Sequence, residues 1–459
     1  MAMDDPRVVV VGAGPAGVRA AEALVKHGLR PLVIDEAPLS GGQIYRRPPP
    51  GFRRTTKELY GFEAAKAEAI HRTFDGLTDV IDYRPRTLAW NVQDRVLYTA
   101  CDDVVTPVSF DALLLATGAT DRVLPFPGWT LPGVYTLGGS QVALKHQGCA
   151  VGRRMVFLGS TPLLYLVAYQ YARAGAEVAA VLDTAPFSAK VRAVPKLLSN
   201  TSMFVKGLYT MAALHRLGVA IEHGVRPVAV EGDDAVAGLR YRRRGEGEVR
   251  IDCDAVAFGF GLRPESQLAD LADCDFRFDP VFHQWLPQCA DDGRAGEGIY
   301  LAGDGARIGG ADAAEVSGEL AALSLIEDLG GGPGDKARSV ELSRRLSSLV
   351  RFQAGLAGAF PWPADMARSL PDNAIVCRCE RVTAGEVRQA VQRPLGGGCE
   401  INRAKAFSRI GMGRCQGRFC GLSSAEISAA AQDRDISSVG RLRGAGPVKP
   451  IKLATVLDE

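Results

Sequence analysis

The amino-acid sequence predicts an α/β protein with two similar α/β units in tandem and a small separate module near its C-terminal end. The first observation is a strand, a glycine turn, a helix and a second strand over residues 7–35. The second observation is the same order of elements over residues 155–182. The third is the concentration of cysteines between residues 377 and 420.

The length and composition fit a globular protein of several domains. The chain has 459 residues, about three domains' length, with 47% apolar and 23% charged residues. Its 54 basic and 52 acidic side chains leave a formal charge of +2, which argues against nucleic acid or an anionic membrane as a partner. We expect no signal peptide, no transmembrane segment and a cytoplasmic location. In that reducing compartment, ten cysteines favour metal binding or redox chemistry over disulfides.

The remaining elements follow from runs of apolar residues and from turn signals. The sequence predicts strands at 7–11, 31–35, 111–115, 155–158, 177–182, 239–244, 249–252, 254–261 and 298–302. It predicts a helix at 311–328 and a mixed connector at 335–376. The expected domains are a first dinucleotide-binding domain (1–120 and 290–335), a second (121–289), a connector (336–370), a cysteine module (371–435) and a tail (436–459).

A glycine motif follows the first strand and opens the first helix. It reads Gly12-Ala-Gly14-Pro-Ala-Gly17, with Pro15 and Ala16 between the last two glycines. In a Rossmann-like motif of this kind, the first glycine permits a tight turn and the second admits a pyrophosphate. The third glycine lets the helix pack closely on the strand. The pattern favours a dinucleotide site over a glycine turn without a ligand.

Further residues around this motif favour flavin adenine dinucleotide (FAD) as the ligand. An acidic pair ends the second strand, where a carboxylate can hold ribose hydroxyls. A glycine turn beyond it suits a loop beside a flat ring or pyrophosphate, although its Arg46 and Arg47 also fit a solvated basic turn. Two more strand ends lie where ligands bind in such sheets. The residues are Asp35 and Glu36; Gly42, Gln43 and Arg46; Ala116, Thr117 and Gly118; and Gly303 and Asp304.

The second unit carries a damaged glycine motif. Its strand and helix are intact, but Thr161 and Leu164 occupy the positions of the second and third glycines after Gly159. A side chain at 161 would crowd a pyrophosphate, and Leu164 would hold the helix away from the strand. Asp183 still ends the next strand. We therefore expect that the fold is kept and that nicotinamide binding is lost.

Four cysteines in two close pairs indicate a metal centre. They are Cys377 and Cys379, then Cys415 and Cys420, and glycines flank the second pair. Such glycines let backbone N–H groups turn toward sulfur atoms, as around iron–sulfur clusters. The Cys-x-Cys spacing argues mildly against structural zinc, which usually takes pairs two to four residues apart. The other six cysteines are scattered singly and fit unliganded thiols.

Two absences bear on the chemistry. No Cys-x-x-Cys dithiol lies near either glycine motif, so the sequence lacks the redox pair of a disulfide reductase. The six histidines are isolated, and no residue pattern indicates an acid–base pair for substrate chemistry.

These motifs resemble the α subunits of opine oxidases, a group that includes the B-type subunit of hydrogen cyanide synthase and the α subunits of multimeric proline and D-hydroxyproline dehydrogenases. The resemblance covers essentially the whole chain. It is carried by Gly12–Gly17, Asp35–Pro38, Gly41–Arg46, Leu124–Trp129, Gly303-Asp304, Cys377–Glu380, Gly411–Gly421 and Pro447–Ile451.

The resemblance implies a fold of the pyridine nucleotide-disulfide oxidoreductase type. It also implies that Cys377, Cys379, Cys415 and Cys420 hold a 2Fe-2S cluster in a module like bacterioferritin-associated ferredoxin. The implied partner is a flavoprotein β subunit resembling D-amino-acid oxidase. Some members of the family add a small γ subunit, some hold FMN between α and β, and in some the first nucleotide site takes ATP instead of FAD.

Three hypotheses of function follow. The first is the electron-transfer subunit of a flavin-dependent amino-acid or opine dehydrogenase, which passes electrons through the cluster to a respiratory acceptor, from the cytoplasm or the periphery of the inner membrane. The second is a stand-alone NAD(P)H-dependent reductase, which the damaged second motif opposes. The third is a non-catalytic scaffold that binds ATP and zinc.

Overall fold

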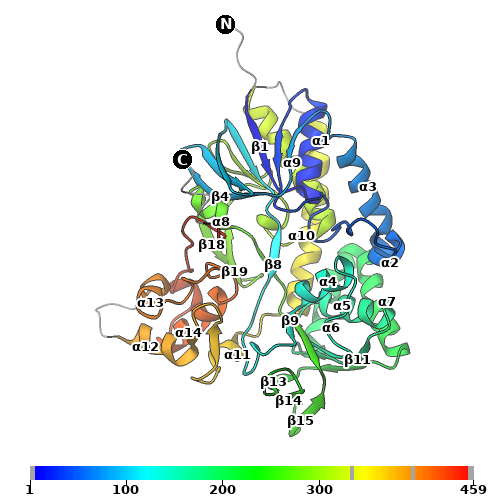
Figure 1. The fold of residues 1–459 in the computed structure, drawn as a ribbon, viewed down its shortest axis with the longest axis vertical. Helices are drawn as coiled ribbons and strands as arrows, with labels where there is room; N and C mark the ends of the chain where they lie inside the picture. The colour runs from blue at the N-terminus through cyan, green and yellow to red at the C-terminus, as the bar shows by residue number, and fades with distance from the viewer. Residues whose placement is uncertain (1–5, 331–334, 394–398, 453–459) are drawn as a thin grey trace.

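The computed structural model describes residues 6–330, 335–393 and 399–452. Within these ranges the chain forms two α/β domains and a smaller, mainly helical module that contains the clustered cysteines (Figure 1). The α/β class with two Rossmann-type domains is therefore confirmed. None of the helices within the described ranges is sufficiently long and apolar to cross a membrane.

The first domain is built on a six-stranded sheet with the order β20–β21–β7–β1–β2–β3. All neighbouring strands are parallel except β20, which pairs antiparallel with β21. The strands are β1 (Val8–Val11), β2 (Leu32–Ile34), β3 (Asp82–Arg84), β7 (Ala112–Leu115), β20 (Arg294–Gly296) and β21 (Ile299–Leu301). Because β20 and β21 follow the second domain in sequence, the first sheet is assembled from both sides of that domain.

Two layers cover this sheet, because alternate residues of a strand point to opposite faces. Val8 and Val10 pack against three helices, whereas Val9 and Val11 pack toward a small antiparallel sheet. The helices are α1 (Pro15–Lys26), α3 (Ala64–Asp75) and α9 (Ala311–Asp328), and the strands are β4 (Thr87–Gln93), β5 (Val96–Cys101) and β6 (Val104–Ser109). The short helices α2 (Thr56–Tyr60) and η1 (Gly61–Glu63) precede α3.

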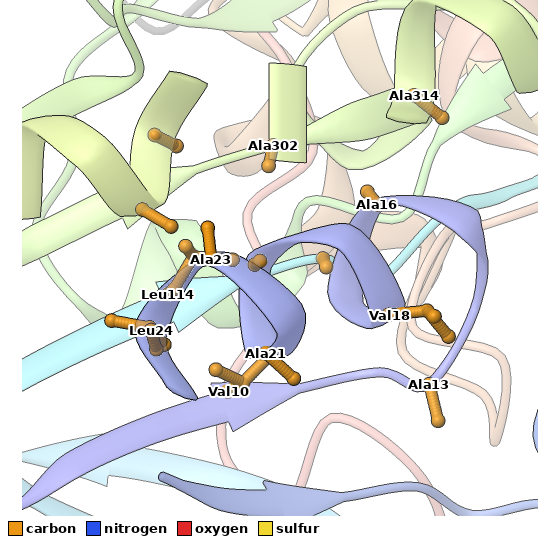
Figure 2. Close-up of a cluster of buried hydrophobic side chains, with 14 of the residues drawn as sticks. Val10, Ala13, Ala16, Val18, Ala21, Ala23, Leu24, Leu114, Ala302 and Ala314 are labelled. Carbon is orange, nitrogen blue, oxygen red and sulfur yellow. The ribbon is translucent and has the colours of Figure 1, made fainter. Parts of the chain in front are cut away.

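Small side chains let α1 and α9 approach each other closely. Figure 2 shows Ala16 of α1 near Ala302 and Ala314, with Val10 and Leu114 of the sheet beneath the same helix. A Cβ atom on Gly318 of α9 would lie only 2.1 Å from the Ala16 carbonyl oxygen. This packing brings the start of α1 against the end of β21, where ligands bind in such sheets.

The second domain has a five-stranded parallel sheet with the order β12–β11–β10–β16–β9. Its strands are β9 (Val134–Thr136), β10 (Arg154–Gly159), β11 (Glu177–Asp183), β12 (Ala220–His223) and β16 (Ala255–Gly259). Its helices are α4 (Leu137–Lys145), α5 (Pro162–Arg173), α6 (Phe187–Leu197), η2 (Leu198–Asn200) and α7 (Thr201–Arg216). The strands predicted at 239–244 and 249–252 pair antiparallel within a second sheet of β13 (Arg226–Glu231), β14 (Gly238–Arg242) and β15 (Glu248–Asp252).

Two connections join the domains. Strand β8 (Ala119–Asp121) leaves the first domain and pairs antiparallel with β17 (Leu262–Pro264), which returns from the second. The segment expected to be a mixed connector is mainly one long helix, α10 (Lys336–Ala359), which packs on both α9 and α6 (Figure 1). The sequence pattern missed this helix because only Leu342, Phe352, Gly355 and Ala359 of its residues are buried.

The cysteine module packs beside the first domain. It contains α11 (Ala364–Arg368), β22 (Ile375–Cys377), β23 (Val382–Thr383), α12 (Ala384–Gln392), α13 (Ile401–Ser408), α14 (Gly421–Ala431) and η4 (Ile436–Ser438). Its neighbours are α8 (Gln267–Leu271), β18 (Phe276–Asp279) and β19 (Gln284–Pro287), and η3 (Gly303–Gly305) follows β21.

The described part of the tail folds back onto the first domain. Arg441 pairs with Asp270 at 2.6 Å, and Val448 is buried and donates its N–H to the Trp90 carbonyl at 3.0 Å. The predicted tail also includes residues 453–459, which lie outside the described residues.

Candidate functional site

One cavity of about 1820 Å³ lies between the two domains. Of the fifteen residues predicted for the nucleotide site, all except Gly17 line this cavity. They come from β1, α1, the ends of β2, β7 and β21, and the turn at Gly42. The structure therefore brings the separate sequence motifs to one place, although their roles in cofactor binding stay a prediction.

The glycine turn has no room for side chains at its critical positions. A Cβ atom on Gly12 would lie 2.3 Å from the Ala116 carbonyl oxygen, and one on Gly17 would lie 1.8 Å from the Gly12 oxygen. Gly12 also has a φ of +108°, which side chains rarely adopt. A Cβ atom on Gly42 would lie 2.9 Å from the Gly14 Cα. The turn and the Gly42 loop therefore form a narrow backbone cradle at the N-terminus of α1, where phosphate binds favourably.

The two acidic residues after β2 occupy different positions. Asp35 accepts hydrogen bonds from the backbone N–H of Ala13 at 2.6 Å and of Ala37 at 2.7 Å. Burial raises the pKa of Asp35 despite these bonds. Glu36 is exposed and pairs with Lys449 of the tail. Asp35 thus holds the glycine turn itself, and both carboxylates line the cavity.

Asp304, which follows β21, also lines the cavity. One carboxylate oxygen, Oδ1, accepts hydrogen bonds from the N–H groups of Gly309 at 2.8 Å and Gly310 at 3.0 Å. Burial raises the pKa of Asp304. Within the described residues its other oxygen, Oδ2, forms no hydrogen bond, so it is available to a hydroxyl group of a ligand.

The two arginines of the predicted basic turn have different surroundings. Arg47 donates to Asp75 at 2.7 Å and to the His71 carbonyl at 3.1 Å, and it holds the loop in place. Arg46 lines the cavity and donates to Gln43 at 2.6 Å. In the described structure the buried Nε of Arg46 has no partner. A buried donor without a partner is costly, so this atom fits an anionic or polar ligand.

Lys145 is a cavity residue that sequence reasoning missed. It ends α4, is only 9% exposed and lies over the Tyr60 ring at 5.7 Å. Across residues 6–330, 335–393 and 399–452, its Nζ forms neither an ion pair nor a hydrogen bond. Burial lowers the pKa of Lys145 to about 8. A lone lysine in an otherwise ordinary helix carries no sequence signal, so only the fold reveals this buried cation.

The second nucleotide motif borders the same cavity, but its own side chains occupy the positions of the missing glycines. Leu164 is fully buried in the domain core, and Thr161 is buried while its hydroxyl accepts the Leu163 N–H. Asp183 is also fully buried, and it accepts the Tyr165 hydroxyl at 2.5 Å and pairs with Lys190 at 2.7 Å. The acidic residue that would bind a ribose is therefore already engaged by this chain.

The four predicted ligand cysteines come together in the C-terminal module. Cys377 and Cys420 lie close enough for each thiol to shift the pKa of the other, and Cys415 likewise affects the pKa of Cys379. The Cys420 thiol and the backbone N–H groups of Glu380, Gly411 and Cys379 lower the pKa of Cys377 to about 6.

The cysteine pairs do not by themselves define a metal site. Across the ranges that the structure describes, no group of three or more His, Cys, Asp and Glu side chains converges on a ready metal position. Gly413 packs directly against one of the four cysteines: a Cβ on Gly413 would lie 2.2 Å from the Cys379 Cβ, so a side chain at this position would collide with it. The donor set and the surrounding N–H groups suit a thiolate-bound cluster, whose presence stays a prediction.

The cysteine module also reaches the nucleotide cavity. Arg418 and Phe419, between Cys415 and Cys420, line the cavity, as do Val448 and Lys449 of the tail. The module and the tail therefore form part of one wall of the dinucleotide site.

The fold and the cavity define a flavin-dependent oxidoreductase with two dinucleotide-type domains. Residues 6–318 match the family Pyridine nucleotide-disulphide oxidoreductase, and residues 372–458 match the Sarcosine oxidase A3 domain. Within that class the chain belongs to the family that contains the A-type subunit of opine oxidase and the HcnB subunit of hydrogen cyanide synthase.

Three comparisons illustrate this membership. The chain is 35% identical to the A-type subunit of opine oxidase from Rhizobium meliloti, over 97% of this chain and 86% of the relative. It is 31% identical to the HcnB subunit of hydrogen cyanide synthase from Pseudomonas protegens, over 96% of each. The crystal structure of L-proline dehydrogenase from P. horikoshii has the same fold, with a TM-score of 0.70, 20% identity and coverage of 98% of this chain and 79% of that one.

Proposed function

We propose that this chain is the electron-transfer subunit of a heteromeric, flavin-dependent dehydrogenase or oxidase of amino acids or opines. The observation that carries the proposal is the shared wall: the loop between Cys415 and Cys420 lines the cavity that contains the glycine motif. A flavin exchanges two electrons with a substrate, and an iron–sulfur cluster carries electrons singly. Adjacent sites of these two kinds suit a protein that accepts electron pairs and passes them on one at a time.

The first nucleotide site fits FAD. The cradle of Gly12, Gly14 and Gly42 would hold the pyrophosphate, Glu36 a ribose, and Asp304 Oδ2 a hydroxyl of the sugar chain. Arg46 and Lys145 would compensate negative charge. ATP shares the adenosine and phosphate groups of FAD, and an absorbance spectrum of the purified protein separates the two ligands.

The cysteine module fits a 2Fe-2S cluster. Cys377, Cys379, Cys415 and Cys420 would be its ligands, as the sequence predicts. The backbone N–H groups of Glu380, Gly411 and Cys379 help to lower the pKa of Cys377, and such groups near sulfur are among the features that set a cluster's potential.

The partner is a second flavoprotein subunit that resembles D-amino-acid oxidase and oxidises the C–N bond of the substrate by taking hydride from its carbon atom. Both relatives compared above are named as subunits, which supports a complex. We place the contact at the cavity rim on the second-domain side, defined as Phe62, Leu166, Phe187, Val191, Leu208 and Tyr209. These rim residues line the cavity and are exposed to solvent, and exposed apolar groups of this kind mark interaction surfaces.

The decisive experiment purifies the native complex and identifies its proteins and cofactors by mass spectrometry and metal analysis. We expect FAD and iron in this chain, a second flavoprotein, and amine oxidation only in the complex. Rapid oxidation of an amino acid by this chain alone would overturn the proposal. A chain that carries ATP and zinc but no flavin or iron would instead support a non-catalytic scaffold.

A further inference from the structure

A buried ion pair joins the cysteine module to the first domain. Arg418 lies between two of the clustered cysteines, and Glu265 directly follows β17. The Arg418 Nε and Nη2 each lie 2.7 Å from a separate oxygen of Glu265. The two side chains are only 8% and 12% exposed. Such a two-armed contact fixes orientation as well as distance, because the guanidinium and carboxylate planes must coincide.

The Glu265 backbone is held by the wall of the nucleotide cavity. The Thr117 hydroxyl donates to the Glu265 carbonyl at 2.5 Å, and the Glu265 N–H donates to the Gly118 carbonyl at 2.9 Å. Thr117 and Gly118 both line the cavity. Glu265 is therefore bonded through its backbone to the nucleotide site and through its carboxylate to the cysteine module.

The Arg418 side chain continues the connection to the cysteines and the tail. Its Nη1 donates to the Val448 carbonyl at 2.7 Å and to the Cys415 carbonyl at 3.2 Å. Nearby, Gln267 donates to the Gln416 carbonyl at 2.7 Å, so the cysteine loop is held at two points. Hydrogen bonds of Glu265 and Arg418 therefore connect Thr117 of the cavity wall to Cys415 of the cysteine module.

We propose that Glu265 and Arg418 are positioning residues that hold the loop of Cys415 and Cys420 at a set distance from the nucleotide site, and so set the rate of electron transfer. The inference rests on the proposed function. In the step concerned, one electron leaves a reduced flavin and one ferric ion of the cluster becomes ferrous. The step occurs twice for each substrate oxidised, the flavin protons pass to solvent, and the respiratory acceptor reoxidises the cluster.

The test substitutes Glu265→Gln, which keeps the shape of the side chain but loses the charge-assisted contact. In the holoprotein, photoreduced anaerobically with EDTA as electron donor, we expect unchanged flavin and iron contents. We expect the cluster to be reduced about tenfold more slowly, because small misplacements of reacting groups are costly in rate. In the ligand-free chain, hydrogen exchange should be faster over residues 415–420. Arg418→Lys keeps the charge but cannot make both contacts, and it should slow transfer likewise.

The cluster potential distinguishes positioning from a change in driving force. Removing the Glu265 carboxylate leaves Arg418 uncompensated, which favours the added electron and raises the potential. The cluster potential is measured by EPR in a redox titration. Slower electron transfer together with a raised cluster potential therefore supports a positioning role.

The matched control is Asp270→Asn. Asp270 forms a largely buried pair with Arg441 between the first domain and the tail, but it does not line the cavity. Equal slowing in D270N, or an unchanged rate in E265Q, would overturn the positioning role. A wild-type protein without iron or without reduction of the cluster by flavin would overturn the proposed function itself.

Discussion

Asp183 and Lys190 form an ion pair inside the second domain, with 2.7 Å between the Lys190 Nζ and a carboxylate oxygen. The Tyr165 hydroxyl donates to the same carboxylate. Asp183 ends the strand where an acid would bind the ribose of a nicotinamide dinucleotide. The structure therefore shows a second obstacle to nicotinamide binding, beyond the lost glycines that the sequence reveals.

We predict that NADH does not reduce this protein. In an anaerobic stopped-flow experiment, the flavin absorbance of the holoprotein should stay unchanged after NADH is added. Restoring the glycine by Thr161→Gly should not create the activity, because Asp183 remains occupied by Tyr165 and Lys190. Rapid bleaching of wild-type protein would contradict this prediction and favour the reductase hypothesis.

The glycine cradle gives a prediction about cofactor retention. Gly17→Ala places a Cβ 1.8 Å from the Gly12 carbonyl oxygen and must displace α1 or the turn. We expect loss of bound flavin and a destabilisation of about 1–3 kcal/mol, as for overpacked cores. Thermal unfolding and flavin content check both effects. Gly358→Ala is the control: it lies in α10 with open space around it and should gain up to about 1 kcal/mol.

Lys145 gives a prediction about pH. Burial lowers its pKa from 10.5 to about 8, so the charged form is disfavoured in the folded chain. Below the pKa of the folded chain, the free-energy cost of burying the charged Lys145 is fully present. This cost disappears as pH rises toward 10.5, because the unfolded chain then loses its proton as well. Lys145→Met should therefore stabilise the ligand-free protein by about 3 kcal/mol at neutral pH. The gain should shrink between about pH 8 and 10.5.

Urea unfolding of both proteins at several pH values measures this difference. The same variant should bind an anionic nucleotide more weakly, since Lys145 lines the cavity. A gain in stability that is independent of pH would show that Lys145 does not titrate as its burial implies.

The cysteine quartet gives a prediction about metal content. Cys415→Ser should remove most of the iron and its EPR signal while the flavin remains, because a hydroxyl is a poor substitute for thiolate. Cys399→Ser is the control, since Cys399 is a free thiol in the same module that stands outside the quartet. Full iron in C415S, or zinc in wild-type protein, would contradict the cluster assignment.

The cavity rim gives a prediction about the complex. Leu208 is 51% exposed and lines the cavity, so Leu208→Asp should reduce co-purification of the flavoprotein subunit with this chain. Val104→Asp is the matched control, since Val104 is 63% exposed on β6 of the first domain. Circular dichroism should show that both variants stay folded. Equal loss of the partner from both variants would argue against the rim as the contact.

The sequence predicted the elements that local patterns define. The helix at 311–328 is observed with the same bounds, and the first strand and glycine turn lie where expected. Apolar periodicity and glycine spacing act over a few residues, so they are readable without the fold. Helix α10 was not predicted, because few of its residues are buried and its apolar residues therefore show little helical periodicity.

By itself, therefore, the sequence determined the α/β class, the two dinucleotide-type units and the grouping of the nucleotide motifs and cysteines. Only the tertiary structure showed that Asp35 holds the glycine turn, that Lys145 lines the cavity and that Asp183 pairs with Lys190. It alone paired Glu265 with Arg418, 153 residues apart in sequence. Contacts between residues so far apart in sequence depend on how whole helices and strands pack. No local pattern around Glu265 or Arg418 predicts that they meet.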